Sequence, residues 1–101
     1  MEYNKLVRDK IPNIIEEGGE IAHVRVLDVE EYRSALLRKL DEEVSEYHES
    51  LKLEELADIL EVVLALAEAG GASREELVIE YQKKHEARGG FEKKIFLISK
   101  E

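Results

Sequence analysis

Residues 40–61 read LDEEVSEYHESLKLEELADILE, and their pattern predicts the two central helices of the chain. Apolar residues on both sides of its midpoint recur every three or four positions, which is the spacing of one face of a helix. We therefore expect one helix over residues 29–50 and another from residue 53 to the two glycines at 70 and 71. If the two helices fold back on each other as an antiparallel hairpin, the acidic residues of the two can face one another.

Two capping boxes mark further helix starts on either side of this hairpin. Glu31 stands three residues after Asp28, and Glu76 stands three residues after Ser73. At this spacing each side chain can bind the backbone N–H of the other residue in the first turn of a helix. The first box supports the helix that begins at residue 29. The second predicts a helix that begins near Ser73 and ends near residue 88, before a pair of glycines. Near the beginning of the chain, a shorter helix is expected over residues 12–17.

Two segments have the pattern of strands. Residues 23–27, HVRVL, are short, alternating and rich in β-branched residues, and residues 91–99 contain the apolar run IFLI. We expect the two to pair, and to pack on the helices or on another subunit, because an isolated pair of strands is marginally stable. The expected fold is mainly α, a helical bundle with a small β element from 23–27 and 91–99, in a single domain over residues 1–101.

Composition excludes several functional classes. The 15 Lys and Arg residues against 24 Asp and Glu residues give a net charge of −9, whereas nucleic-acid binders usually carry a basic excess. The chain has no cysteine, which excludes disulfides and thiolate zinc sites and favours a cytoplasmic location. No stretch reaches the ~18 apolar residues of a membrane span. A chain of 101 residues has a limited core, which favours a homodimer or homotetramer.

Two pairs of acidic residues are the strongest chemical signal. Glu43 and Glu46 are three positions apart, as are Glu55 and Asp58, so each pair projects from one face of its helix. Like charges at this spacing destabilise a helix by roughly 0.2–0.5 kcal/mol per pair, and a bound cation reverses that cost. Oxygen ligands suit Mg²⁺ or Mn²⁺. Such pairs are also common on solvated helix faces, but these border the apolar faces of their helices.

The two acidic pairs, in their order along the chain, match an ExxE…ExxD signature. Two more motifs accompany them, KLVRDKIP at residues 5–12 and KxxxRGGF at residues 84–91. With these four motifs, the chain resembles the MazG-like all-α nucleotide pyrophosphohydrolases, the superfamily that includes phosphoribosyl-ATP pyrophosphohydrolase. The resemblance covers nearly the whole chain. One departure is that only eight residues separate the two acidic pairs, fewer than is usual in the wider family.

The resemblance implies hydrolysis of a nucleoside triphosphate, including non-standard ones, to a nucleoside monophosphate and pyrophosphate. It implies that the catalytic residues and the ligands of Mg²⁺, or of Mn²⁺ in its place, are Glu43, Glu46, Glu55 and Asp58. It implies that the triphosphate is bound by Arg8, Lys10, Lys84 and Arg88. Glu42 and Glu61 are candidates for supporting the metal ligands, with ordinary exposed acids as the equal alternative, and Lys5 and Lys93 are weaker candidates for phosphate contacts.

Two alternatives stay open at the level of the sequence. The chain could be a phosphoribosyl-ATP pyrophosphohydrolase, which shares the chemistry and the helical scaffold, although the motifs at both ends favour the house-cleaning type. It could instead be a non-catalytic helical interaction module with an acidic surface. Turnover of phosphoribosyl-ATP would identify the first alternative, and the lack of any metal-dependent turnover would identify the second.

Overall fold

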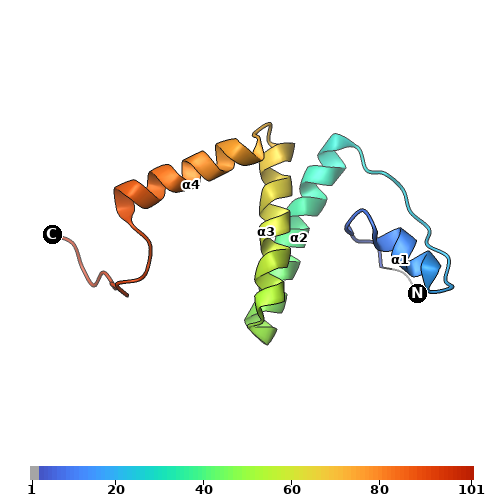
Figure 1. Cartoon of the computed structure of the whole chain (residues 1–101), viewed down its shortest axis with the longest axis horizontal. Coiled ribbons are helices and arrows are strands. Elements are labelled where there is room, and N and C mark those ends of the chain that lie inside the picture. The colour runs from blue at the N-terminus through green and yellow to red at the C-terminus, as the bar shows by residue number, and fades with distance from the viewer. Residues whose placement is uncertain (1–2) are drawn as a thin grey trace.

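Four α-helices make up the regular structure of the chain (Figure 1). The computed structural model describes residues 3–101. The helices are α1 (Ile11–Glu17), α2 (Val29–Ser50), α3 (Leu53–Ala69) and α4 (Arg74–Arg88). These bounds lie within one or two residues of the predicted ones, and the mainly helical architecture is confirmed. Within the described residues, no helix is both long and apolar enough to cross a membrane.

Both predicted capping boxes are present. At the start of α2, the Asp28 carboxylate accepts a hydrogen bond of 2.9 Å from the Glu31 N–H, and at the start of α4 the Ser73 hydroxyl accepts one of 3.1 Å from the Glu76 N–H. In each box the glutamate side chain in turn binds the backbone N–H of the capping residue. These bonds satisfy N–H groups that would otherwise lack partners, so they fix where the two helices begin.

Helices α2 and α3 form the antiparallel hairpin at the centre of the molecule (Figure 1). Two residues connect them, Leu51 and Lys52. Leu51 adopts the left-handed conformation, with φ of 56°, and its N–H donates to the Tyr47 carbonyl at 2.8 Å. This single residue ends α2 and reverses the chain, which allows α3 to begin at Leu53.

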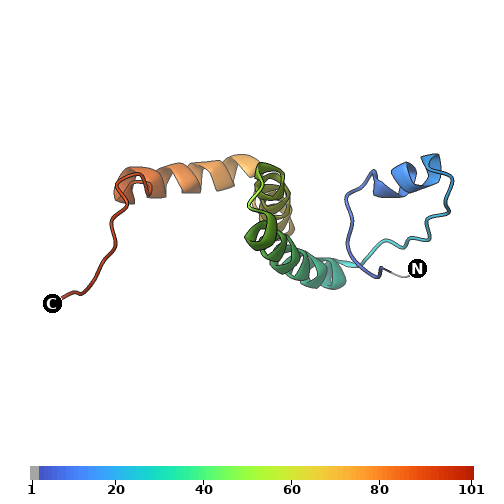
Figure 2. The same cartoon turned by 90° about the horizontal axis from the view of Figure 1, so that it is seen from below.

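The hairpin also holds the small core. Its buried hydrophobic residues are Ala35, Leu36 and Val62, contributed by both helices. Helix α4 projects from the far end of α3, and α1 stands apart from the hairpin on the other side (Figures 1 and 2). The molecule is therefore open and elongated, with principal extents of 60 × 32 × 23 Å.

The predicted small β element is wrong for the chain as the structure describes it. Residues 23–27 have no regular secondary structure, residues 91–99 begin with a turn and continue irregularly, and neither segment is a strand. The first segment lies between α1 and α2 and the second follows α4, so the two lie at opposite ends of the molecule (Figure 1). A strand needs a partner for its backbone hydrogen bonds, and this topology keeps each segment away from the other.

Candidate metal centre

Glu43 is the buried charged residue at the centre of the candidate site. It lies on α2, on the side that meets Glu55 and Asp58 of α3, and is 6% exposed. Burial raises the pKa of its carboxyl group above the ordinary value, and the nearby Glu46 carboxylate adds to the rise. Lys39 opposes this shift, since its ammonium group lies 3.2 Å from Glu43 Oε1, one helical turn away. The lysine therefore compensates only one of the two carboxylate oxygens.

The second oxygen of Glu43 has no partner. Oε2 is buried and forms no hydrogen bond with any described residue. Leaving a polar group buried and unsatisfied costs about 1–3 kcal/mol, and more for a charged group. A buried carboxylate oxygen without a donor is therefore a position that a cation would stabilise.

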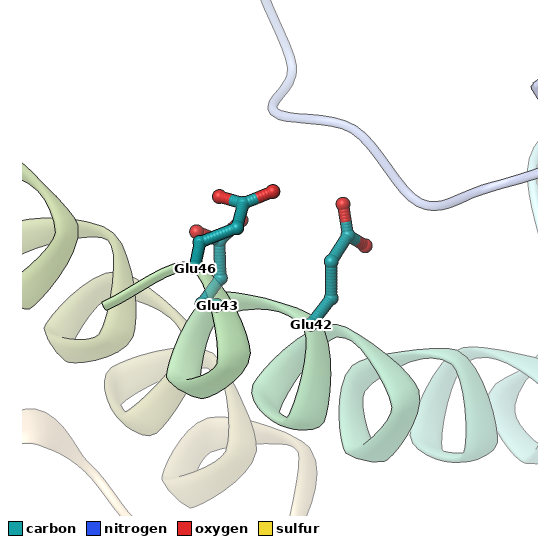
Figure 3. A group of neighbouring side chains, drawn as sticks. All are labelled: Glu42, Glu43 and Glu46. Atoms are coloured by element: carbon teal, nitrogen blue, oxygen red, sulfur yellow. The ribbon is translucent and has the colours of Figure 1, made fainter. Parts of the chain in front are cut away.

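Glu43 belongs to two groups of acidic residues. In the first, oxygens of Glu42, Glu43 and Glu46 lie within 4.8 Å of one another. Figure 3 shows these three side chains pointing to the same side of α2, with Glu43 and Glu46 next to each other. In the second, oxygens of Glu43, Glu55 and Asp58 lie within 4.8 Å of one another, which joins α2 to α3. The hairpin thus gathers acids from both predicted pairs around one buried carboxylate.

The short connection between the helices sets the position of the α3 acids. It places the first turns of α3 opposite the last turns of α2, so that Glu55 and Asp58 face the acids of α2 (Figure 1). The Ser50 hydroxyl, at the end of α2, donates to Glu55 Oε1 at 3.4 Å. A gap of eight residues between the two acidic pairs is therefore compatible with one cluster.

Two basic residues before α1 contact the same cluster. Arg8 Nη2 donates to Asp58 Oδ1 at 2.6 Å, and Arg8 Nη1 lies 3.5 Å from Glu61 Oε1. Lys5 Nζ lies 3.5 Å from Glu42 Oε1. All five side chains are at least partly exposed, so these ion pairs are solvated and individually weak. They nevertheless bring two cations from the first residues of the chain to the acids of the hairpin.

The other predicted phosphate contacts lie elsewhere. Lys10 forms no ion pair with the acidic residues of the described chain. Lys84 and Arg88 lie in the second half of α4, which leaves α3 at the end remote from Glu55 and Asp58 (Figure 1). Arg88 lines a separate hollow beyond the end of α4, together with residues that include His85, Gly89, Gly90, Lys93 and Lys94. Within one chain, therefore, the structure brings Arg8 to the acids but not these other three residues.

Sequence reasoning missed the role of Lys39 and gave Glu42 only a supporting position. Lys39 lies four residues before Glu43, which is the spacing of an ion pair on a helix, so the signal was available. Its burial lowers the pKa of the ammonium group, but the contacts with Glu43 and Glu42 outweigh this effect and raise the pKa. The lysine is therefore firmly charged next to the buried carboxylate.

Comparison with known proteins gives one limited similarity. A segment of 42 residues is 50% identical to an uncharacterized protein of Mycolicibacterium smegmatis. The matched segment is 42% of this chain and 43% of that protein, so the match spans less than half the length of each. No protein-family model matches the chain, and no solved structure does. The function must therefore be inferred from the geometry and from the sequence motifs.

Proposed function

We propose that this chain is a Mg²⁺-dependent nucleoside triphosphate pyrophosphohydrolase of the MazG-like, all-α kind. The observation that supports this most is the buried carboxylate of Glu43, which belongs to two groups of acids and whose Oε2 has no partner among the described residues. An acidic surface that served only for solubility would not need a buried carboxylate, because burial disfavours the charged form and raises its pKa. The motifs at residues 5–12 and 84–91 add the resemblance to nucleotide hydrolases.

The donor set fits a hard divalent cation. One carboxylate oxygen each of Glu43, Glu55 and Asp58 lies within 4.8 Å of the others, and Mg²⁺ and Mn²⁺ prefer such oxygen ligands. Glu43, Glu55 and Asp58 would hold the ion, with Glu46 and Glu42 beside it. When bound, Mg²⁺ supplies charge neutralisation for the phosphate oxygens and lowers the pKa of a water molecule. That water would attack the α-phosphorus, and pyrophosphate would leave.

The residues of the chain have separate tasks in this scheme. One carboxylate of the cluster accepts the proton of the attacking water. Arg8 turns from Asp58 toward the phosphate oxygens, for which its guanidinium group offers two parallel donors. Lys5, which contacts Glu42, can likewise turn toward the phosphate oxygens, where its ammonium group acts as a point charge. The cations before α1 would thus exchange carboxylate partners for substrate phosphates.

Lys84 and Arg88 remain proposed phosphate contacts, and they require more than one copy of the chain. They stand on α4, away from the acids of their own hairpin (Figure 1). In a homodimer or homotetramer, α4 of one copy can approach the cluster of another. A cytoplasmic location goes with this proposal, because a chain without cysteine needs no oxidising compartment.

A panel of nucleoside triphosphates and phosphoribosyl-ATP, assayed with Mg²⁺, tests the proposed function. We expect release of pyrophosphate, not orthophosphate, and loss of turnover with a chelator. Asp58→Asn keeps the size of a cluster residue and removes its charge, so it should nearly abolish turnover. Glu49→Gln, on α2 but outside both acidic groups, should retain it. A preference for phosphoribosyl-ATP would select that alternative, and absence of metal-dependent turnover from the whole panel would refute the enzyme.

A further inference from the structure

The segment that follows α4 is an exposed apolar arm. We use this name for residues 91–98, which follow the end of α4 (Figures 1 and 2). Its five large apolar side chains are 76–98% exposed; they are Phe91, Ile95, Phe96, Leu97 and Ile98. Burying one such side chain is worth about 1.5–3 kcal/mol, so a run of them in water is a strong driving force for association.

An apolar groove lies between α3 and α4 on the same molecule. Its volume is about 360 Å³. The residues that line it include no charged side chain; they are Leu60, Val63, Leu64, Leu77, Val78 and Tyr81. Several of these are themselves largely exposed, with Leu60 at 55% and Tyr81 at 63%. The groove is therefore an apolar surface on which the exposed apolar side chains of the arm could be buried.

The chain exposes more surface than a compact monomer of its mass, and the excess is the size of an interface with a second copy. The accessible surface is 9432 Å² for a mass of 11.6 kDa. A compact monomer of this mass exposes about 5,800 Å², so the excess is about 3,600 Å². An obligate interface removes about 1,000–2,500 Å² from each partner. The excess is large enough for one such interface and leaves room for a second.

Charge complementarity points in the same direction. The last eleven residues, which contain the arm, carry three lysines and two glutamates in a chain whose net charge is −9. The rest of the chain therefore carries the whole acidic excess. The opposite net charges of this segment and of the remainder of a second copy favour their association.

We propose that the arm of one copy docks into the α3–α4 groove of a second copy. The arm does not line the groove of its own copy, and it leaves α4 at the end remote from α3 (Figure 1). Gly89, with φ of 79°, and a turn closed by the Lys94 N–H on the Phe91 carbonyl direct it away from the helix (Figure 1). Reciprocal docking around a two-fold axis covers both arms and both grooves, as in a closed dimer. This docking names the surface of the proposed oligomer and does not depend on its hydrolytic activity.

Cross-linking tests this docking without background, because the chain contains no cysteine. Two single variants of the 101-residue chain, Leu97→Cys in the arm and Val78→Cys in the groove, are mixed and treated with a short bismaleimide. We expect a covalent dimer of twice the 11.6 kDa chain mass that contains one copy of each variant. Glu80→Cys is the matched control, since a position two residues further along α4 faces the opposite side of the helix.

Three outcomes would overturn the inference. One is no dimer from variants whose helical circular dichroism is unchanged, and another is equal dimer yield with the Glu80→Cys control. The third is a double variant that gives only an internally cross-linked monomer, which would place the arm in its own groove. Ile95→Cys with Leu60→Cys provides a second pair, should either first variant fold poorly. The pyrophosphate assay is separate, so a failure of docking and a failure of the proposed function can be told apart.

Discussion

Glu43→Gln should make the metal-free protein more stable while abolishing its response to Mg²⁺. The substitution keeps the shape of a 6%-exposed side chain and removes its charge. It removes the charge from a carboxylate whose Oε2 is buried without a partner, a situation that costs about 1–3 kcal/mol. The lost contact with Lys39 offsets part of this gain, but Lys39 keeps Glu42 at 3.4 Å and is not left unpaired. We expect a net gain of about 1 kcal/mol, or about 4–8 °C in Tm for a domain of this size.

The effect should depend on pH in a defined direction. Because burial raises the pKa of Glu43 in the folded state above its ordinary 4.5, the native carboxyl group is protonated more readily than the unfolded one. Below pH 4.5 it is neutral in both states, so wild type and variant should have similar stability. As pH rises through the folded pKa the wild type gains a buried charge and loses stability, and the difference should reach its full value once the pH lies above that pKa.

Thermal unfolding followed by circular dichroism, with chelator and with Mg²⁺, measures both effects. Mg²⁺ at a hundred times its dissociation constant should stabilise the wild type by about 2.7 kcal/mol and leave the variant nearly unchanged. Glu49→Gln, on the same helix and exposed, should behave like the wild type under all conditions. A lower Tm of Glu43→Gln at every pH, or equal stabilisation of both proteins by Mg²⁺, would refute the role of Glu43 as a cation ligand.

The Arg8→Ala variant should bind Mg²⁺ about 1.5–5-fold more tightly in the absence of nucleotide, because it lacks an exposed ion pair of about 0.2–1 kcal/mol that competes for Asp58. Calorimetric titration measures the Mg²⁺ affinity, and weaker binding would contradict the prediction. The same variant should raise KM for the triphosphate, and an unchanged KM would show that Arg8 does not contact substrate. Asp28→Ala should lower the free energy of unfolding by about 1 kcal/mol in urea titrations, because α2 loses its capping box. Leu51→Gly should raise it by about 0.5–1 kcal/mol, because Leu51 is exposed and left-handed; a loss would mean that its side chain packs in the native state.

The helices were predictable because their signals are local. Capping residues, glycine pairs and apolar periodicity act within a few residues, so the bounds of α2 and α4 followed from the sequence. The meeting of Glu43 with Asp58 was predicted only on the condition that the two helices form an antiparallel hairpin, and the structure meets that condition.

The remaining features depend on contacts between distant residues. Strand pairing of residues 23–27 with 91–99 required the two ends of the molecule to meet, and α4 separates them. The approach of Arg8 to Asp58 crosses fifty residues, and helical spacing does not predict it. The burial of Glu43 Oε2 without a partner depends on side-chain packing, to which a pattern of charges gives no access.

The two-residue connection between α2 and α3 has a consequence for how the chain folds. The interactions of the hairpin join residues that are close in sequence, and chains with mostly local contacts fold in microseconds to milliseconds. The acidic cluster is therefore assembled early, by one chain alone. Docking of two chains is slower and depends on concentration, so refolding should show a rapid phase that dilution does not change, followed by a slower phase that dilution delays.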